Sequence, residues 1–168
     1  VRNLVGYVPQ EQMLFKRPVN ENILLGNPNA RSEELDKAVR IADFEKDINY
    51  LTDGLRTMVG ESGTTLSGGQ KQRLSIARAL IKDPQILILD DSLSAVDGTT
   101  ERNIIDHLKE FRSGKTNIIV THRFSAIRDA DRIIVMENGV ITQSGTHEEL
   151  LRQDGWYKSQ YIQQITMN

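Results

Sequence analysis

The 168-residue sequence contains no cysteine, which excludes disulfides, thiolate nucleophiles and cysteine-ligated metal centres. Long apolar runs are also missing. The longest, Ile86–Leu89 and Ile133–Met136, hold four residues each, whereas a helix needs about 20 to span a bilayer. The net charge is only −2, so nothing in the composition attracts the chain to nucleic acid in bulk. These absences leave a globular chain without a transmembrane segment.

Enough apolar residues remain for a packed core. Hydrophobic residues make up 38% and charged residues 26%, which fits one ordered domain. The first residues, VRNLVGYV, have neither an initiator Met nor a signal-peptide pattern. We therefore expect Val1 to mark a cut within a longer polypeptide.

Local patterns in the first half of the chain predict a strand, two helices and a loop. Leu4–Pro9 is apolar and ends at a proline, as a buried strand does. Residues 31–48 have helical spacing, with Ser32 as the expected N-cap. Asp53–Thr65 contains three glycines and predicts a loop. Ser67 is expected to cap a helix that ends near Ile81.

The second half alternates strands and helices. Ile86–Asp90 and Thr116–His122 predict two buried strands, the first covered on both faces. Asn138-Gly139 predicts a hairpin turn, and Thr146 with Glu149 has the spacing of a capping box. Further helices are expected at residues 98–111 and in the C-terminal segment. This alternation predicts an α/β fold with a largely parallel sheet.

The turn LSGGQ places two glycines at a helix start. Gly68 and Gly69 let backbone N–H groups approach an anion closely, and the helix N-terminus adds positive potential. The Ser67 hydroxyl can donate a hydrogen bond, and Lys71 and Arg73 carry positive charge. The arrangement is a competent phosphate site. The simpler alternative is an N-cap that opens an amphipathic helix.

The run from this turn through RLSIARAL resembles the signature motif of ATP-binding cassette (ABC) ATPases. Four further stretches resemble the family's other motifs in the order the family requires: VGYVPQ with Gln10 (Q-loop), ILILDD (Walker B strand), Ser94–Asp97 (D-loop) and IVTHR with His122 (H-loop). The resemblance implies a P-loop NTPase-like, mostly parallel sheet with helices on both faces. It also implies an inserted helical signature subdomain at about residues 11–82, with residues 1–10 and 83–168 forming the RecA-like core and C-terminal helices.

Two segments resemble the exporter type of this family. TMVGESGTTLSGGQ is similar to the loop that faces the coupling helices of a membrane domain, and QSGTHEELL is similar to the exporter C-terminal segment. Lys16 and Arg17 depart from the small residue usual in exporters. The resemblance implies a multidrug-type exporter half that powers efflux of lipophilic compounds or drugs. It would lie on the cytoplasmic side of the cell membrane, in an integral membrane transporter.

A phosphate loop of the form G-x-x-x-x-G-K-[ST] is missing from the sequence. SGKT at Ser113–Thr116 is a decoy, because Lys109 stands where the first glycine should be and the segment follows a helix. We expect the true loop, Walker A, to lie in an N-terminal portion that precedes Val1. Without that loop's amides and lysine, the chain alone should neither bind nor hydrolyse ATP.

The resemblance assigns a role to each matched residue, with ATP and Mg²⁺ as the cofactors. The ATP contacts fall to the signature and D-loop residues: Ser67, Gly68, Gly69, Gln70, Ser94 and Asp97. Asp90 and Gln10 would bind Mg²⁺. The catalytic residues would be Asp91, His122 and Gln10. The implied partners are a second ABC half-transporter, paired head to tail, and the transmembrane domain of the same polypeptide. No nucleic acid is implied.

Each of these residues has a simpler reading. Gln10 could be a surface amide, His122 an ordinary strand-end histidine, and Asp97 only a helix N-cap. His107 and His147 lie outside every motif, and we expect them at the surface. Arg78 and Lys82 are expected on a solvated helix face.

Asp91 departs from the family pattern, which has glutamate at this position. Aspartate is one methylene shorter, and a displacement of about 1 Å can lower a rate roughly 100-fold. Exporters built from two unlike halves often carry such a change, so the chain resembles the degenerate half of a heterodimer. A non-hydrolysing regulatory subunit and a lobe of a chromosome-maintenance or DNA-repair ATPase remain as alternatives.

Overall fold

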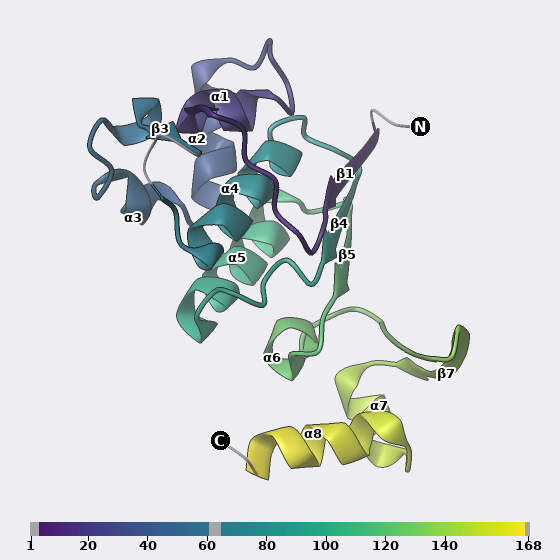
Figure 1. Ribbon diagram of the computed structural model, residues 1–168. Coiled ribbons are helices and arrows are strands. Elements are labelled where there is room, and N and C mark those ends of the chain that lie inside the picture. Colours follow the sequence, from purple (N-terminus) through teal and green to yellow (C-terminus); the bar gives the residue numbers. More distant parts are fainter. Residues whose placement is uncertain (1–3, 61–64, 167–168) are drawn as a thin grey trace. The chain divides into compact units, whose positions relative to one another are not determined.

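The computed structural model describes residues 4–60 and 65–166 of the chain (Figure 1). The chain divides into two compact units, residues 1–122 and 123–168, and each is described by itself. Within the described ranges, no helix is long and apolar enough to cross a membrane.

The first unit is organised by a three-stranded parallel sheet in the order β1 (Val5–Val8), β4 (Ile86–Asp90), β5 (Thr116–Val120). The register pairs Val8 with Leu89 and Asp90 with Val120. The predicted parallel α/β arrangement is confirmed. Because all three strands run the same way, their carboxyl ends meet at one edge.

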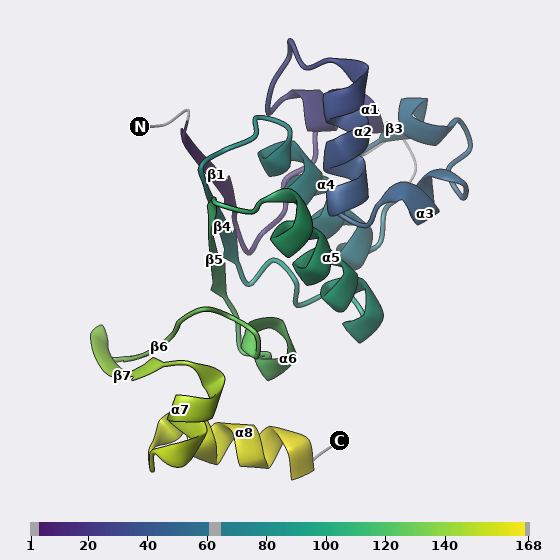
Figure 2. The ribbon, with the colours of Figure 1, turned by 180° about the vertical axis from the view of Figure 1, so that it is seen from behind.

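Helices α4 (Gly68–Leu80) and α5 (Gly98–Phe111) cover one face of this sheet (Figures 1 and 2). Leu87 and Leu89 are fully buried beneath them. On the other face Ile118 and Val120 are 45% and 51% exposed. The expected cover on both faces of β4 is therefore not seen among the described residues, since its alternate side chains are only half-buried.

Several short elements precede α4 in the sequence. They are β2 (Arg17–Pro18), α1 (Val19–Leu24), α2 (Ser32–Ile41), α3 (Glu45–Ile48), the 3₁₀ turn η2 (Gly54–Arg56) and β3 (Met58–Val59). The helices α1 and α2 among them pack against α4. Strands β2 and β3 pair antiparallel. The predicted subdomain at about residues 11–82 includes these elements, and its boundaries stay a prediction. The predicted loop at Asp53–Thr65 includes residues 61–64, which lie outside the described ranges.

The helix expected over residues 31–48 is two helices. Ser32 is the first residue of α2, so the predicted N-cap is wrong by one position, and the Arg31 N–H donates to the Glu34 carboxylate at 2.7 Å. The chain turns between α2 and α3, where Asp43 has a left-handed φ of 54°. Aspartate tolerates this conformation better than most residues do, which makes the break possible without glycine.

The second unit packs a hairpin against three helices. Its elements are α6 (Phe124–Ile127), β6 (Ile133–Glu137), β7 (Val140–Gly145), α7 (His147–Arg152) and α8 (Trp156–Thr166). Asn138 and Gly139 have φ of 51° and 79°, so the predicted turn is confirmed. The Thr146–Glu149 capping box is confirmed as well.

His147 is buried in this unit, so its expected surface position is wrong. It is 5% exposed, and its Nδ1 lies 2.8 Å from the Tyr157 hydroxyl oxygen. Burial, with smaller contributions from nearby charges, raises the pKa of Tyr157 to about 12. The sequence shows only that His147 begins a short helix. Its burial follows from the packing of α7 on α8.

The one-sided cover of the sheet makes a direct prediction. Leu89→Ala should destabilise the 168-residue chain by about 2–5 kcal/mol, because it leaves a cavity in the core. Urea unfolding followed by circular dichroism measures the difference. Ile118→Ala, on the open face of the neighbouring strand, is the control and should cost well under half as much. Equal losses would show that both faces are packed.

Candidate functional site

Four of the predicted residues lie at the carboxyl edge of the sheet. Asp90 ends β4 and Asp91 follows it, while Gln10 and His122 each come two residues after their strands. The parallel sheet thus brings together side chains from distant parts of the sequence. His122 and Gln10 are exposed, and Asp90 and Asp91 are half-buried.

Tyr7 joins this edge, although the sequence analysis did not single it out. Its hydroxyl donates a hydrogen bond to Asp90 Oδ2 at 2.9 Å, and this bond raises the pKa of Tyr7 above its usual value. The register explains the contact, because Tyr7 pairs with Ile88, two residues before Asp90. Knowledge of the strand pairing would have been enough to find it.

Asp91 forms hydrogen bonds through its side chain, its backbone N–H and its carbonyl. Gln10 Nε2 donates to its Oδ2 at 3.4 Å, its N–H donates to the Val120 carbonyl at 2.8 Å, and its carbonyl accepts from Ser94 Oγ at 2.8 Å. Its φ is 47°, in the left-handed region. Gln10, Asp91 and Ser94, three of the predicted site residues, are therefore directly connected.

The glycine turn begins α4 as predicted. Ser67 Oγ accepts from the Gln70 N–H at 3.2 Å, and Gln70 Oε1 accepts from the Ser67 N–H at 2.9 Å, which forms a capping box. Gly68 and Gly69 are the first two residues of the helix. Gln70 Nε2 donates to Asp47 Oδ1 at 3.0 Å, so the Gln70 side-chain amide links the turn to α3.

Gln72 connects this turn to the stretch Ser94–Asp97. Its Nε2 donates to Ser94 Oγ at 3.1 Å, and its Oε1 accepts from the Ala95 N–H at 2.9 Å. A Cβ atom added at Gly69 would lie 2.9 Å from the Ala95 carbonyl oxygen. The two segments are therefore in close contact. Gln72 carries no sequence signal beyond being a polar residue at a buried helix position.

Asp97 is the N-cap of α5, as its simpler reading predicted. Its Oδ1 accepts from the Thr99 and Thr100 N–H groups, each at 3.0 Å. Hydrogen bonds from the Thr100 backbone and hydroxyl lower the pKa of Asp97 to about 2. The carboxylate is therefore charged at any physiological pH.

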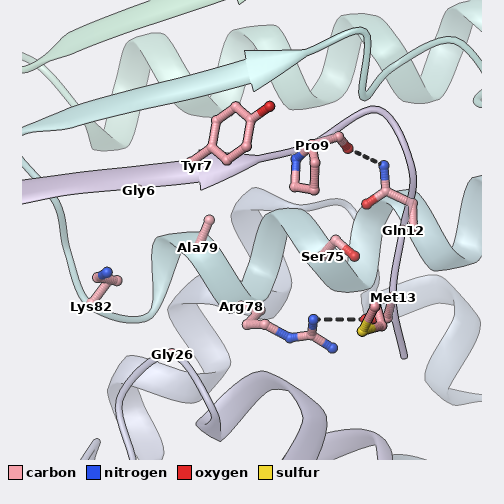
Figure 3. A pocket seen from close by; sticks show the side chains of 10 residues that line it. All are labelled: Gly6, Tyr7, Pro9, Gln12, Met13, Gly26, Ser75, Arg78, Ala79 and Lys82. Carbon is pink, nitrogen blue, oxygen red and sulfur yellow. Dashed lines mark hydrogen bonds between the residues drawn. The ribbon is translucent and has the colours of Figure 1, made fainter. Parts of the chain in front are cut away.

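The cations of α4 are mostly used inside the unit. Arg73 forms a buried ion pair with Asp47, and its positive charge is thereby compensated. Arg78 donates to the Asn22 carbonyl at 2.8 Å and to the Met13 carbonyl at 2.8 Å, the second of which Figure 3 shows. Its expected place on a solvated face is wrong, and burial lowers its pKa. It lines a pocket of about 210 Å³ between β1, α4 and the segment after Pro9.

The sheet edge offers oxygen ligands of the kind Mg²⁺ prefers. They are the Asp90 carboxylate and the Gln10 amide oxygen, whose nitrogen already faces Asp91. Across the described residues, no group of three or more potential metal-ligating side chains is gathered. This donor set suits an ion that keeps most of its waters or takes oxygens from a bound phosphate.

Residues 1–94 match the family model described as ABC transporter. The chain belongs to the ABC transporter family. It is 57% identical over 98% of its length to the probable multidrug resistance ABC transporter ATP-binding/permease protein YheI of Bacillus subtilis. It is 47% identical, over 98% of its length, to the mitochondrial potassium channel ATP-binding subunit of Mus musculus.

The solved structure of a bacterial Atm1-family ABC exporter with ATP bound is similar in fold. The TM-score is 0.92 at 40% sequence identity, and the match covers 97% of this chain and 29% of that one. The match covers 28% of the Bacillus relative and 23% of the mouse relative. The predicted family and fold class are confirmed.

The close contact between the glycine turn and Ala95 predicts a size limit at Gly69. Gly69→Ala should push the two segments apart and destabilise the chain by about 1–3 kcal/mol, since the obstructing atom belongs to the backbone. Gly98→Ala is a matched control, because an added Cβ there meets nothing within 4 Å. Thermal unfolding of both variants measures the difference. Similar melting temperatures would contradict the contact.

Proposed function

We propose that this chain is part of the ATP-hydrolysing domain of an ABC exporter. The observation that carries this proposal is the contact between the Ser67–Gln70 turn and the Ser94–Asp97 stretch, next to the Gln10–Asp91 pair. All these groups belong to one compact unit. The exporter would act in a membrane, with this chain on the cytoplasmic side and a transmembrane domain in the same polypeptide.

The ATP-contacting role falls to the start of α4. Ser67 can donate its hydroxyl proton while its oxygen caps the helix, and the Gly68 and Gly69 amides lie at the positive end of the helix dipole. We assign these residues, with Gln70, Ser94 and Asp97, to ATP that a second half-transporter holds.

Hydrolysis would use the sheet edge. Asp91 would act as general base and orient the attacking water, and His122 would contact the γ-phosphate and hold that water in place. Gln10 would bind Mg²⁺ and sense whether the γ-phosphate is present. Asp90 and Gln10 would hold Mg²⁺, which neutralises charge on the phosphates when bound. The Tyr7 hydroxyl keeps one carboxylate oxygen of Asp90 oriented.

The open face of the sheet supports a contribution from another segment. Tyr7, Ile118 and Val120 are exposed apolar or aromatic residues on strands β1 and β5. A further layer of the polypeptide that covers this face and carries the phosphate loop would complete both the core and the ATP site. Without it, few contacts to the β- and γ-phosphates remain.

The missing phosphate loop predicts that the 168-residue chain binds ATP only very weakly. Titration calorimetry with MgATP should detect no binding at micromolar concentrations, where complete phosphate-loop domains bind. A longer polypeptide that also carries a phosphate loop is the positive control. Magnesium-dependent micromolar binding by the 168-residue chain would refute the requirement for an added loop.

The aspartate at position 91, where the family has glutamate, favours a heterodimer with two unequal ATP sites. The site that uses this shorter acid would turn over slowly, while the site completed by Ser67–Gln70 would rely on the partner's glutamate. A non-hydrolysing regulatory role is the second candidate that Asp91 favours. In both cases the transported compound, for which we propose lipophilic compounds or drugs, would be selected by the membrane helices.

This asymmetry predicts different effects for two matched substitutions. In the reconstituted pair, replacing the partner's catalytic glutamate by Gln should lower ATP turnover by about 100-fold or more, while Asp91→Asn should change it by less than about twofold. Phosphate release measures both. Large and equal losses would contradict the asymmetry, and little loss from either would contradict hydrolysis by these acids.

A further inference from the structure

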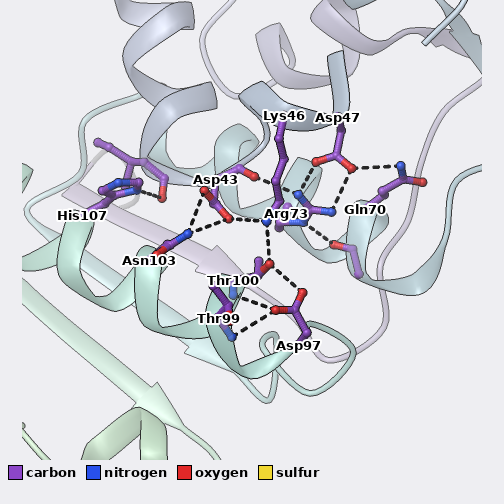
Figure 4. A network of polar contacts seen from close by, with 12 residues as sticks. Asp43, Lys46, Asp47, Gln70, Arg73, Asp97, Thr99, Thr100, Asn103 and His107 are labelled. Carbon is purple, nitrogen blue, oxygen red and sulfur yellow. Dashed lines mark hydrogen bonds and ion pairs between the residues drawn. The ribbon is translucent and has the colours of Figure 1, made fainter. Parts of the chain in front are cut away.

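The segment Asp43–Asp47, here called the bridging segment, touches both functional turns of the first unit (Figure 4). It comprises the left-handed Asp43 and the start of α3. None of its residues belongs to a recognised motif. Its polar side chains nevertheless form hydrogen bonds to the signature turn, to the start of α5 and to Arg73 of α4.

On the side of the signature turn, Asp47 is the shared acceptor. Its carboxylate accepts from Gln70 Nε2 at 3.0 Å and from both terminal nitrogens of Arg73, one at 3.0 Å. Arg73 Nε also donates to the Gly69 carbonyl at 3.3 Å. Because Gln70 Oε1 caps Ser67, Asp47 orients the amide that shapes the whole turn.

On the side of α5, Lys46 continues the hydrogen bonds from the Asp97 cap. The Thr100 hydroxyl gives its proton to Asp97 Oδ2 at 2.7 Å, which leaves its oxygen to accept from Lys46 Nζ at 2.8 Å. Lys46 therefore reaches, through one hydroxyl, the carboxylate that begins α5. Lys46 thus connects α3 to the start of α5, while Gln72 connects α4 to Ser94.

Asp43 joins the two sides. Its carboxylate accepts from Lys46 Nζ at 2.8 Å and from Asn103 Nδ2 at 3.4 Å, while its carbonyl accepts from Arg73 Nη1 at 2.8 Å. The left-handed turn at Asp43 lets both groups be used at once. One short segment therefore fixes two turns that are 30 residues apart in sequence, Ser67–Gln70 and Asp97–Thr100.

We propose that Lys46 and Asp47 are positioning residues that hold the signature turn and the Asp97 cap in one fixed arrangement. This inference rests on the proposed function, in which both turns meet a second half-transporter. Neither residue touches ATP in this scheme. Loss of Lys46 should therefore slow hydrolysis of partner-held ATP without weakening its binding, because the partner's own phosphate loop supplies that binding.

The test substitution is Lys46→Met, in the full-length polypeptide purified as its native assembly. The Lys46 side chain is 48% exposed, and exposed ion pairs add little to stability, so the variant should fold. Its kcat for ATP should fall about tenfold while KM stays within about twofold, since a small displacement mainly affects the transition state. Lys46→Arg, which keeps the charge and reach, should recover most of the kcat.

Hydrogen–deuterium exchange of the same assembly gives a readout independent of activity. In Lys46→Met, the amides of Ser67–Lys71 and of Thr99–Glu101 should both exchange about threefold faster or more, because the bridging segment that contacts both turns loses its ion pair at Asp43 and its hydrogen bond to Thr100. Lys158→Met is the matched control. It removes a lysine that pairs with Asp154 at 2.8 Å in the second unit, and it should leave both segments unchanged.

Thr100→Val tests the proposed route. It should lower kcat as Lys46→Met does, and the double variant should be no slower than either single one. Unchanged kcat and exchange in Lys46→Met would overturn the inference, as would multiplicative losses or an equal effect from Lys158→Met. If the wild-type assembly hydrolyses no ATP, the proposed function fails on its own, and the exchange pattern still decides whether Lys46 joins the turns.

Discussion

The carboxylate of Asp47 is the group on which the first unit most depends. It neutralises the buried Arg73 and accepts from Gln70 at the start of α4. Removing a partner from such a pair leaves an uncompensated buried charge, at a cost of about 3–5 kcal/mol. The same guanidinium donates to the Asp43 carbonyl, so it also stabilises the break between α2 and α3. One ion pair thus connects α3, the turn at Asp43 and the start of α4.

The candidate site residues lie in two places that are held by different kinds of contact. At the sheet edge, Asp90 ends β4 and Asp91 follows it, and both are placed by backbone pairing with β5, with side-chain contacts such as the Gln10 bond at 3.4 Å. The start of α4 is fixed by side chains instead, through Gln70, Gln72 and Arg73. Ser94 contacts both places, because its hydroxyl donates to Asp91 and accepts from Gln72. A displacement of either place would therefore change a hydrogen bond of the Ser94 hydroxyl.

The sequence predicted what local rules determine. The Ser67 cap, the glycine turn and the Asn138-Gly139 hairpin depend on residues within a few positions of one another, and they are confirmed. Apolar runs that alternate with helices predicted a largely parallel sheet, and the strand order β1-β4-β5 comes from the structure. The Tyr7–Asp90 bond, the buried Gln72 and the buried His147 depend on partners 10 to 83 residues away, which periodicity cannot identify. The break at Asp43 was missed for the same reason, since Arg73 stabilises it from another helix.

The left-handed backbone at Asp91 also bears on how a shortened acid can persist. Aspartate and asparagine enter this conformation more readily than residues with longer side chains. A change from glutamate to aspartate at this corner is therefore easy for the fold, even where it lowers the reach of the carboxylate. Selection for stability would not oppose it, and only selection for turnover would. In the heterodimer that we propose, in which the partner keeps glutamate, the fold would tolerate aspartate at this corner because the backbone conformation suits it.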